Sequence, residues 1–254
     1  MEVLKLPFQK LQLLIKMIEV TKAIVINTIK YGDTSLIATC YTEKAGIKTY
    51  ILKGVLSSKK GKLKPAYFQP LNQLTLTANH NNKGSLNTIR DIEVTNFYSA
   101  IYADIKKQSI ALFLAEILYY SIKEEEQNLS LFSYLETSFL WLDTHSNISN
   151  FHLLFLLNLT KYLGFYPETN STNNTYFDLV GGVFSSHSSI NTVTGENLTQ
   201  FKKLLGINFD VLHEVDFNAS SRQAVLTILL QYFEFHLSGF KKPKSINVLK
   251  SVFS

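Results

Sequence analysis

Five short runs rich in β-branched and apolar residues decide the fold of this chain of 254 residues. They read VTKAIVI (residues 20–26), LIATCYT (36–42), IKTYILKGV (47–55), LNQLTLT (71–77) and SLNTIRDIEV (85–94). The fourth run alternates apolar and polar residues with period two, as half-buried strands do, and segments of turn-forming residues separate the runs. Five short antiparallel strands in about 80 residues predict a small closed β-barrel, with the strand count and size of an OB-fold.

After Phe97 the apolar residues recur with the period of a helix. We expect helices over 101–118, 131–142 and 151–163, from about Ser220 through His236 to Gly239, and over 245–253, with Ser220 and Ser221 as N-caps of the fourth. Residues 165–193 interrupt this pattern with Pro167, a cluster of Asn, Ser and Thr, and two adjacent glycines. The predicted fold class is α+β: an all-β OB-fold barrel over 17–96, then an all-α domain over 97–254 with an irregular insert at 165–193.

The composition excludes several classes of protein. Apolar residues make up 46% of the chain and charged residues 18%, which is enough for a core and excludes wholesale disorder. No run reaches 18 uninterrupted apolar residues, so no membrane span is expected. Residues 1–16 lack the apolar core and cleavage site of a secretory signal. Because Cys40 is the only cysteine, no internal disulfide can form, and we expect a cytoplasmic protein.

Charge is distributed unevenly along the chain. Residues 1–90 carry 14 Lys and Arg against 4 Asp and Glu, a net charge of +10, whereas residues 91–254 carry 11 against 16, a net charge of −5. A basic module of this kind is typical of proteins that bind polyanions. A solvated lysine-rich surface explains the same count, because the chain has 23 Lys and 2 Arg.

The segments that resemble enzyme motifs each lack a required residue or spacing. The segment from Gly54 to Lys62 has six residues between its glycines instead of the four of a phosphate-binding loop, and Leu63 stands where a magnesium-binding hydroxyl is needed. His213 and Glu214 lack the second histidine of a zinc protease. We therefore expect no enzyme, no catalytic residues, no cofactor and no small-molecule substrate. A hydrolase whose site is assembled from distant residues stays open as an alternative.

Other titratable residues are expected to pack rather than react. Cys40 lies inside a predicted strand, where a small buried apolar role is the usual one. His152 and His236 lie within predicted helices and are interpreted as packing residues whose ring nitrogens have hydrogen-bond partners. The run Glu124–Glu126 is interpreted as a solvated helix end.

Lysines gather after the third predicted strand and again near the end of the chain. We expect both groups to bind DNA: Lys53, Lys59, Lys60, Lys62 and Lys64, then Lys241, Lys242 and Lys244. A lysine-rich loop on a barrel can follow a phosphate backbone, and the neighbouring Tyr67 and Phe68 can stack unpaired bases. The alternative is that Tyr67 and Phe68 are core residues of the next strand.

Several motifs, in this order, resemble those of a known family. They are YGDTSLI (31–37), YTEKAG (41–46), Lys53-Gly54 before the basic loop, FQPL (68–71), LGFYP (163–167), Phe177 with Gly181-Gly182, and GFKKPKS (239–245). Together they resemble the bacterial recombination mediator RecO family. The family pattern starts near Ile18, so we interpret residues 1–16 as an extension, and Met17 could be the native start.

The resemblance implies a role in DNA repair and homologous recombination without catalysis. Such proteins bind single- and double-stranded DNA and anneal complementary strands. With RecR they help to load RecA on DNA coated by SSB, whose acidic C-terminal tail they contact. The location implied is the cytoplasm, in association with the nucleoid and away from any membrane. An OB-fold RNA-binding module of translation or RNA processing stays open as an alternative.

The insert departs from the family pattern. Many members carry two cysteine pairs there, whereas this chain reads NSTNNT (170–175) and SSH (185–187). A structural zinc site takes about four thiolate or imidazole ligands, and His187 is the only such residue in the insert. We therefore predict no metal site and a loop held by packing and hydrogen bonds.

Overall fold

The computed structural model describes residues 18–57, 62–80 and 86–253. The chain divides into two compact units, which are described separately. The barrel unit comprises residues 1–98 and 122–136, and the helical unit comprises residues 99–121 and 137–254. The expected extension at residues 1–16 lies outside the described residues.

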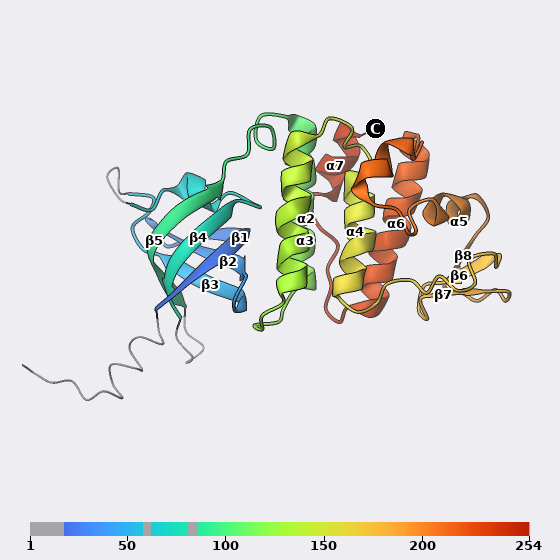
Figure 1. Ribbon diagram of the computed structural model, residues 1–254, viewed down its shortest axis with the longest axis horizontal. Coiled ribbons are helices and arrows are strands. Elements are labelled where there is room, and N and C mark those ends of the chain that lie inside the picture. The colour runs from blue at the N-terminus through green and yellow to red at the C-terminus, as the bar shows by residue number, and fades with distance from the viewer. Residues whose placement is uncertain (1–17, 58–61, 81–85, 254) are drawn as a thin grey trace, which may run out of the picture. The chain divides into compact units, whose positions relative to one another are not determined.

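The barrel unit contains a closed five-stranded barrel (Figure 1). Its strands are β1 (Ile18–Tyr31), β2 (Ser35–Thr42), β3 (Gly46–Leu52), β4 (Gln73–Asn79) and β5 (Asn87–Asn96). They follow each other around the barrel in the order β1-β2-β3-β5-β4, and the β3–β5 pair that completes the ring is parallel while the others are antiparallel. The predicted five-stranded closed barrel is confirmed, and its strands are antiparallel as predicted except for the β3–β5 pair.

Strand β1 is twice as long as the run that predicted it, because it serves two partners. Its first half pairs with β4 from Ile18 to Ile24, and its second half pairs with β2 from Ala23 to Tyr31. A register shift between Val25 and Asn27 marks the bulge between the two halves. Bulges increase the local bend of a strand, which helps a short sheet to close on itself.

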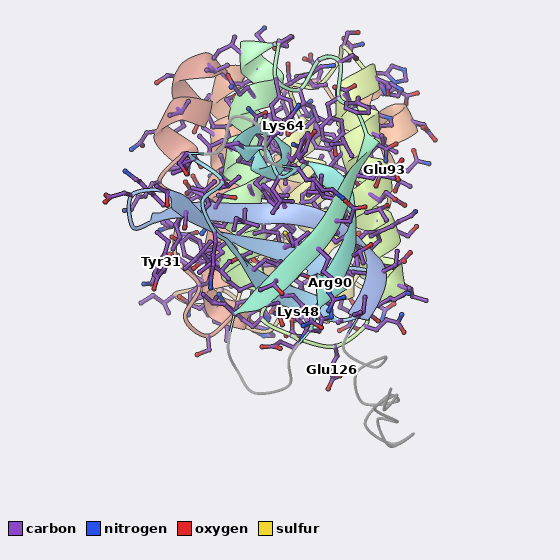
Figure 2. The ribbon with its side chains drawn as sticks, turned by 90° about the vertical axis from the view of Figure 1, so that its left-hand side faces the viewer. Tyr31, Lys48, Lys64, Arg90, Glu93 and Glu126 are labelled. Atoms are coloured by element: carbon purple, nitrogen blue, oxygen red, sulfur yellow. The ribbon has the colours of Figure 1, made fainter. Side chains whose placement is uncertain are left out.

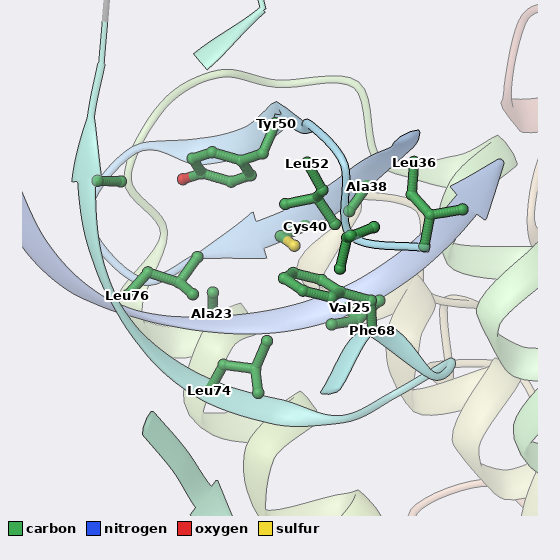
Figure 3. Close-up of a cluster of buried hydrophobic side chains, with 12 residues drawn as sticks. Ala23, Val25, Leu36, Ala38, Cys40, Tyr50, Leu52, Phe68, Leu74 and Leu76 are labelled. Carbon is green, nitrogen blue, oxygen red and sulfur yellow. The ribbon is translucent and has the colours of Figure 1, made fainter. Parts of the chain in front are cut away.

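Inward-facing side chains of the strands fill the barrel (Figure 3). The buried cluster consists of Ala23, Val25, Leu36, Ala38, Cys40, Tyr50, Leu52, Val55, Phe68, Leu74, Leu76 and Ala78. Cys40 is a buried core residue as predicted, and burial raises the pKa of its thiol to about 12. Phe68 is buried and Tyr67 packs against the cluster, so both are core residues, but they lie in the 3₁₀-helix η1 (Pro65–Phe68) rather than in a strand.

The connection between α2 (Ile105–Ser121) and α3 (Leu129–Thr144) belongs to the barrel unit. The carbonyl oxygen of Glu124 accepts a hydrogen bond from Ile47 N at 3.0 Å, and Lys48 Nζ lies 2.7 Å from Glu125 Oε2. The ring of Phe132 stacks on Tyr41 at 6.1 Å. The acidic run is therefore exposed as predicted, but its backbone and Glu125 also hold the barrel, which a merely solvated helix end does not do.

The helical unit is built around α4 (Phe151–Tyr162), which is buried on nearly every side from Phe151 to Thr160, as its continuous apolar run predicts. The other elements are α5 (Gly195–Lys202), the 3₁₀-helix η2 (Phe209–Glu214), α6 (Ala219–His236) and α7 (Ile246–Val252). The N-cap of α6 is Asn218, whose Oδ1 accepts from Ser221 N at 2.8 Å, so the prediction of a serine cap is wrong.

The insert forms a small sheet within its irregular segment. Strands β6 (Tyr176–Asp178), β7 (Val183–Ser185) and β8 (Thr192–Thr194) have three residues each and lie in the order β7-β6-β8. Phe177 on the central strand is fully buried. Its ring centroid lies 4.9 Å from that of Phe184, 5.1 Å from that of Phe201 and 5.7 Å from that of Tyr232.

The two packing histidines differ. His236 Nε2 lies 3.0 Å from the Leu179 carbonyl oxygen and its ring stacks on Phe165, which confirms the prediction. His152 is buried, but its Nδ1 has no hydrogen-bond partner among the described residues, so the prediction of a satisfied residue is wrong there. Burial, with a smaller contribution from the charge of Arg222, lowers the pKa of His152 to about 3.

Candidate nucleic-acid interface

The loop after β3 starts against the β1–β2 turn. Gly54 N donates to Ser35 Oγ at 3.2 Å, and Leu56 N donates to the carbonyl oxygen of Thr34 at 2.9 Å. Gly54 has a φ of +67°, which favours glycine and turns the chain at this point. These contacts fix the first residue of the lysine-rich loop, Lys53, beside the turn.

An aromatic ring and a cation share the outer face of the barrel at this place. Tyr31 pairs with Ser35 across β1 and β2, and Leu36 pairs with Leu52, so Ser35 lies level with Lys53. Directly opposite residues of neighbouring strands point to the same face of a sheet. The Tyr31 side chain is 54% exposed and lies at one edge of the barrel in the end view of Figure 2.

Apolar residues continue this face along the strands. Ile29 pairs with Ile37, and Ile37 pairs with Ile51, which places three isoleucines in one row two residues from Tyr31. Ile29 is 52% exposed. OB-folds bind oligonucleotides on the face of strands 2 and 3 and on the loop between strands 1 and 2, and these residues occupy that face. We call Tyr31, Ser35, Lys53, Ile29, Ile37 and Ile51 the outer face.

The described lysines of the predicted loop do not form one cluster. Lys62 Nζ lies 3.7 Å from Asp91 Oδ1 on β5, and both side chains are largely exposed, so this pair contributes little to stability. Lys64 precedes η1, with its Nζ 6.0 Å from the centre of the Tyr67 ring. Figure 2 shows Lys64 well apart from Tyr31. Lys59 and Lys60 lie outside the described residues.

Several other lysines of the barrel unit have structural partners. Lys22 Nζ lies 2.9 Å from Glu136 Oε1, Lys48 pairs with Glu125, and Lys44 Nζ donates to the carbonyl oxygen of Val20 at 2.6 Å. The ion pair raises the pKa of Lys22. In the described part of the chain, Lys30 and Lys53 are exposed cations of the barrel without such a partner.

The barrel is less basic than the charge of residues 1–90 suggests. Strand β5 carries Arg90 but also exposed Asp91 and Glu93, and Figure 2 shows Arg90 and Glu93 on this strand. Residues 18–98 carry 11 basic and 5 acidic residues, a net charge of +6. The net charge of the barrel is still positive, as the polyanion-binding prediction requires, but it is smaller than that of residues 1–90.

The second group of lysines belongs to the helical unit. Lys241, Lys242 and Lys244 are exposed in the segment between α6 and α7. Lys242 Nζ lies 3.3 Å from Glu234 Oε2. The eight lysines named as a DNA-binding site are therefore divided between two compact units.

Tyr31 and Lys30 were not among the residues expected from the sequence to bind DNA, although both are exposed at the end of β1. The signal was available, because both residues directly precede Gly32-Asp33, a turn between two predicted strands. The length of β1 could not be predicted from the sequence. Because β1 extends to Tyr31, both residues lie at the end of the barrel and are exposed.

Among the described residues, every helix is too short or too polar to span a lipid bilayer. The same residues contain no group of three or more His, Cys, Asp or Glu side chains placed to hold a metal ion.

A closed five-stranded barrel with a partly basic outer face, followed by a helical region, defines an OB-fold protein of two units. The family model described as "Recombination protein O N terminal" matches residues 17–98, and the one described as "Recombination protein O C terminal" matches residues 102–245. The chain belongs to the recombination protein O (RecO) family.

Curated relatives agree over nearly the whole chain. The DNA repair protein RecO of Flavobacterium psychrophilum is 45% identical over 92% of this chain and 98% of its own length. The protein of the same name from Christiangramia forsetii is 46% identical over the same shares. That of Bacteroides fragilis is 36% identical over 93% of this chain and all of its own length.

Proposed function

We propose that this protein is a recombination mediator that binds single- and double-stranded DNA and works without catalysing a reaction. The observation that carries the proposal is the row of Tyr31 and Lys53 on the outer face of an OB-like barrel. Membership of a family of DNA repair proteins supports it.

The two residue types of the outer face have complementary roles in binding a single strand. Lys53 would neutralise phosphates, together with the other lysines of the loop and the group after α6 (Lys59, Lys60, Lys62, Lys64, Lys241, Lys242 and Lys244). Such contacts give affinity that depends on salt and not on sequence. Tyr31 would stack an unpaired base, and the isoleucine row would contact the next one.

Membership of the RecO family supports the remaining steps of the proposal. Two strands held by sequence-independent contacts keep their base edges free, so the protein can anneal them. The proposed protein partners are RecR and the acidic C-terminal tail of SSB, with RecA as the protein loaded on the DNA, and the proposed location is the nucleoid in the cytoplasm. An annealing assay with complementary strands coated by SSB tests this step, and failure to accelerate annealing in the presence of RecR contradicts it.

Salt dependence tests the phosphate contacts. If about five lysines neutralise phosphates of a single strand, log K falls against log salt with a slope of about −3 to −4, at about 0.7 per contact. The variant K59A/K60A/K62A should flatten the slope by about 2, for unrelated sequences alike. Lys250→Ala, an exposed lysine of α7 outside the proposed site, is the matched control and should leave the slope unchanged. An unchanged slope in the triple variant would show that these lysines are exposed to solvent and do not contact phosphates.

Tyr31 tests the stacking contact. Tyr31→Ala should weaken single-strand binding by about 1–3 kcal/mol, whereas Tyr31→Phe keeps the ring and should bind nearly as well. Double-strand binding should change less in both variants, because paired bases are not available for stacking. Tighter binding of an RNA of the same sequence would favour the RNA-binding alternative.

A further inference from the structure

The helical unit contains a cavity that the proposed DNA contacts do not use. It has a volume of about 210 Å³, below the roughly 300 Å³ at which pockets for small-molecule ligands begin. It lies between the end of α3, the turn after it, and η2. The lining residues are Trp141, His145, Ser146, Asn147, Phe209, Asp210 and His213. Its size suits one inserted side chain better than a cofactor.

Stacked rings form one wall of the cavity. The Trp141 ring lies 4.1 Å from that of His145 with an interplanar angle of 7°, and 5.3 Å from that of Phe209. Behind them, Phe151 stacks on Trp141 at 5.5 Å and on Phe209 at 4.9 Å. Phe151 is fully buried, so this wall is backed by the core.

The two histidines present hydrogen-bond acceptors. His145 Nδ1 lies 2.9 Å from the Trp141 carbonyl oxygen, and His213 Nδ1 lies 2.9 Å from the Asp210 carbonyl oxygen. A carbonyl oxygen only accepts, so each Nδ1 carries the proton, and in the neutral ring the Nε2 lone pair remains available. Within the described part of the chain, the Asp210 carboxylate has neither a hydrogen bond nor an ion pair.

Carboxylates give the cavity a negative surrounding. Glu214 and Asp216 are exposed close to Asp210 in sequence, and this concentration of carboxylates disfavours a phosphate.

We infer that this cavity receives an arginine side chain from a protein partner. A guanidinium group has five donors in one plane, which match the Asp210 carboxylate and the histidine Nε2 atoms, and its flat face stacks on aromatic rings. A lysine ammonium has the charge but not the plane, so it fits this wall less well.

The fluorescence of Trp141 tests this directly, because it is the only tryptophan of the chain. The full-length protein is titrated with the peptide acetyl-Gly-Arg-Gly-amide and with its counterpart containing citrulline, which has the same shape without the charge. The arginine peptide should change the Trp141 emission in a saturable way, and the citrulline peptide should bind at least about tenfold more weakly. Asp210→Asn should weaken the arginine peptide by about tenfold, and Glu214→Gln, which changes the same charge outside the lining, should not.

Three outcomes overturn the inference. Equal binding of the two peptides shows that the charge is not recognised. Equal loss in the Asp210 and Glu214 variants shows that only the general negative field matters. Saturation of the Trp141 signal by an acidic peptide or by an oligonucleotide, and not by the arginine peptide, assigns the cavity to another class of partner.

Discussion

The barrel and the insert are both β-structures, but different interactions hold them. The barrel strands have 7–14 residues, and every strand has two neighbours around a closed ring. The strands of the insert have three residues each, and β7 and β8 are open edges. Strands this short cannot be stable through their hydrogen bonds alone.

What replaces strand length in the insert is aromatic packing from outside the sheet. Phe177 packs on Phe201 of α5 and on Tyr232 of α6, and Tyr232 Oη donates to the Phe165 carbonyl oxygen at 2.7 Å. Closure stabilises the barrel from within, whereas the small sheet depends on the helices beside it.

Phe177→Ala should have the largest effect. Removal of a fully buried phenylalanine costs about 3–5 kcal/mol, and Phe177 is the residue of the three-residue strands that packs on both α5 and α6. We expect local unfolding, seen as proteolytic cleavage within 165–194 while the barrel stays resistant. Leu76→Ala, a buried residue of the barrel, should instead loosen all five strands together. Global unfolding of both units by Phe177→Ala would contradict the contrast.

Gly46→Ala should destabilise the barrel by about 2–4 kcal/mol. Gly46 has a φ of +60°, and a Cβ there would overlap backbone atoms of Glu124 and Glu126. Gly32 has the same φ with nothing within 4 Å of that position, so Gly32→Ala should cost only about 1 kcal/mol. Chemical denaturation measures both, and equal losses would show that the approach of residues 122–126 does not constrain the turn.

Tyr232→Phe should destabilise the insert by about 1–1.5 kcal/mol. It keeps the ring that packs on Phe177 and removes only the hydroxyl that donates to Phe165. Hydrogen exchange of the amides in 176–194 should rise while exchange in the barrel stays constant. A change confined to the barrel would show that this hydroxyl does not hold the sheet.

Removal of residues 1–16 should change the melting temperature by no more than about 3 °C. We propose these residues as an extension of the barrel domain over 17–96, because β1 begins at Ile18 and Pro7 interrupts any helix before it. A chain that begins at Met17 is compared with the full chain by thermal unfolding. A large drop, or loss of soluble protein, would show that the segment packs on the fold.

Chelation should have no effect at all on the insert. With His187 as its only imidazole or thiol, and with aromatic packing around Phe177, the insert should bind no zinc. Elemental analysis of the purified protein should therefore find no stoichiometric zinc, and a chelator should leave the melting temperature unchanged. One zinc per chain would overturn this prediction.

Much of the fold was predictable because it rests on local periodicity. Period two marked the strands, and the helical period marked the helices of the second unit, with α4 recognisable by its apolar run. The predictions failed where the exact end of a helix depends on one hydrogen bond of a capping side chain. Serines 220 and 221 are good caps, yet Asn218 caps α6, because helix ends depend on a contact of a few ångströms that periodicity does not resolve.

The candidate site was less predictable than the fold. Five lysines within 12 residues suggested one cluster, but Lys62 faces Asp91 of another strand, while Lys53 follows β3 at the level of Ser35, two strands from Tyr31. The neighbours of a side chain on a barrel are set by strand register, and register joins residues that are distant along the chain.

Composition and short-range spacing were enough to predict the five barrel strands, the main helices after them and the sign of the barrel's charge, but not the three strands of the insert, α5 or the 3₁₀-helices. Only the tertiary structure decided which residues share a surface: Tyr31 with Lys53 on the outer face, and Trp141 with Asp210 and His213 around the cavity. The physical reason is that function here depends on contacts between segments far apart in the chain. Closure of the barrel and packing of the helices create those contacts, and no local pattern records them.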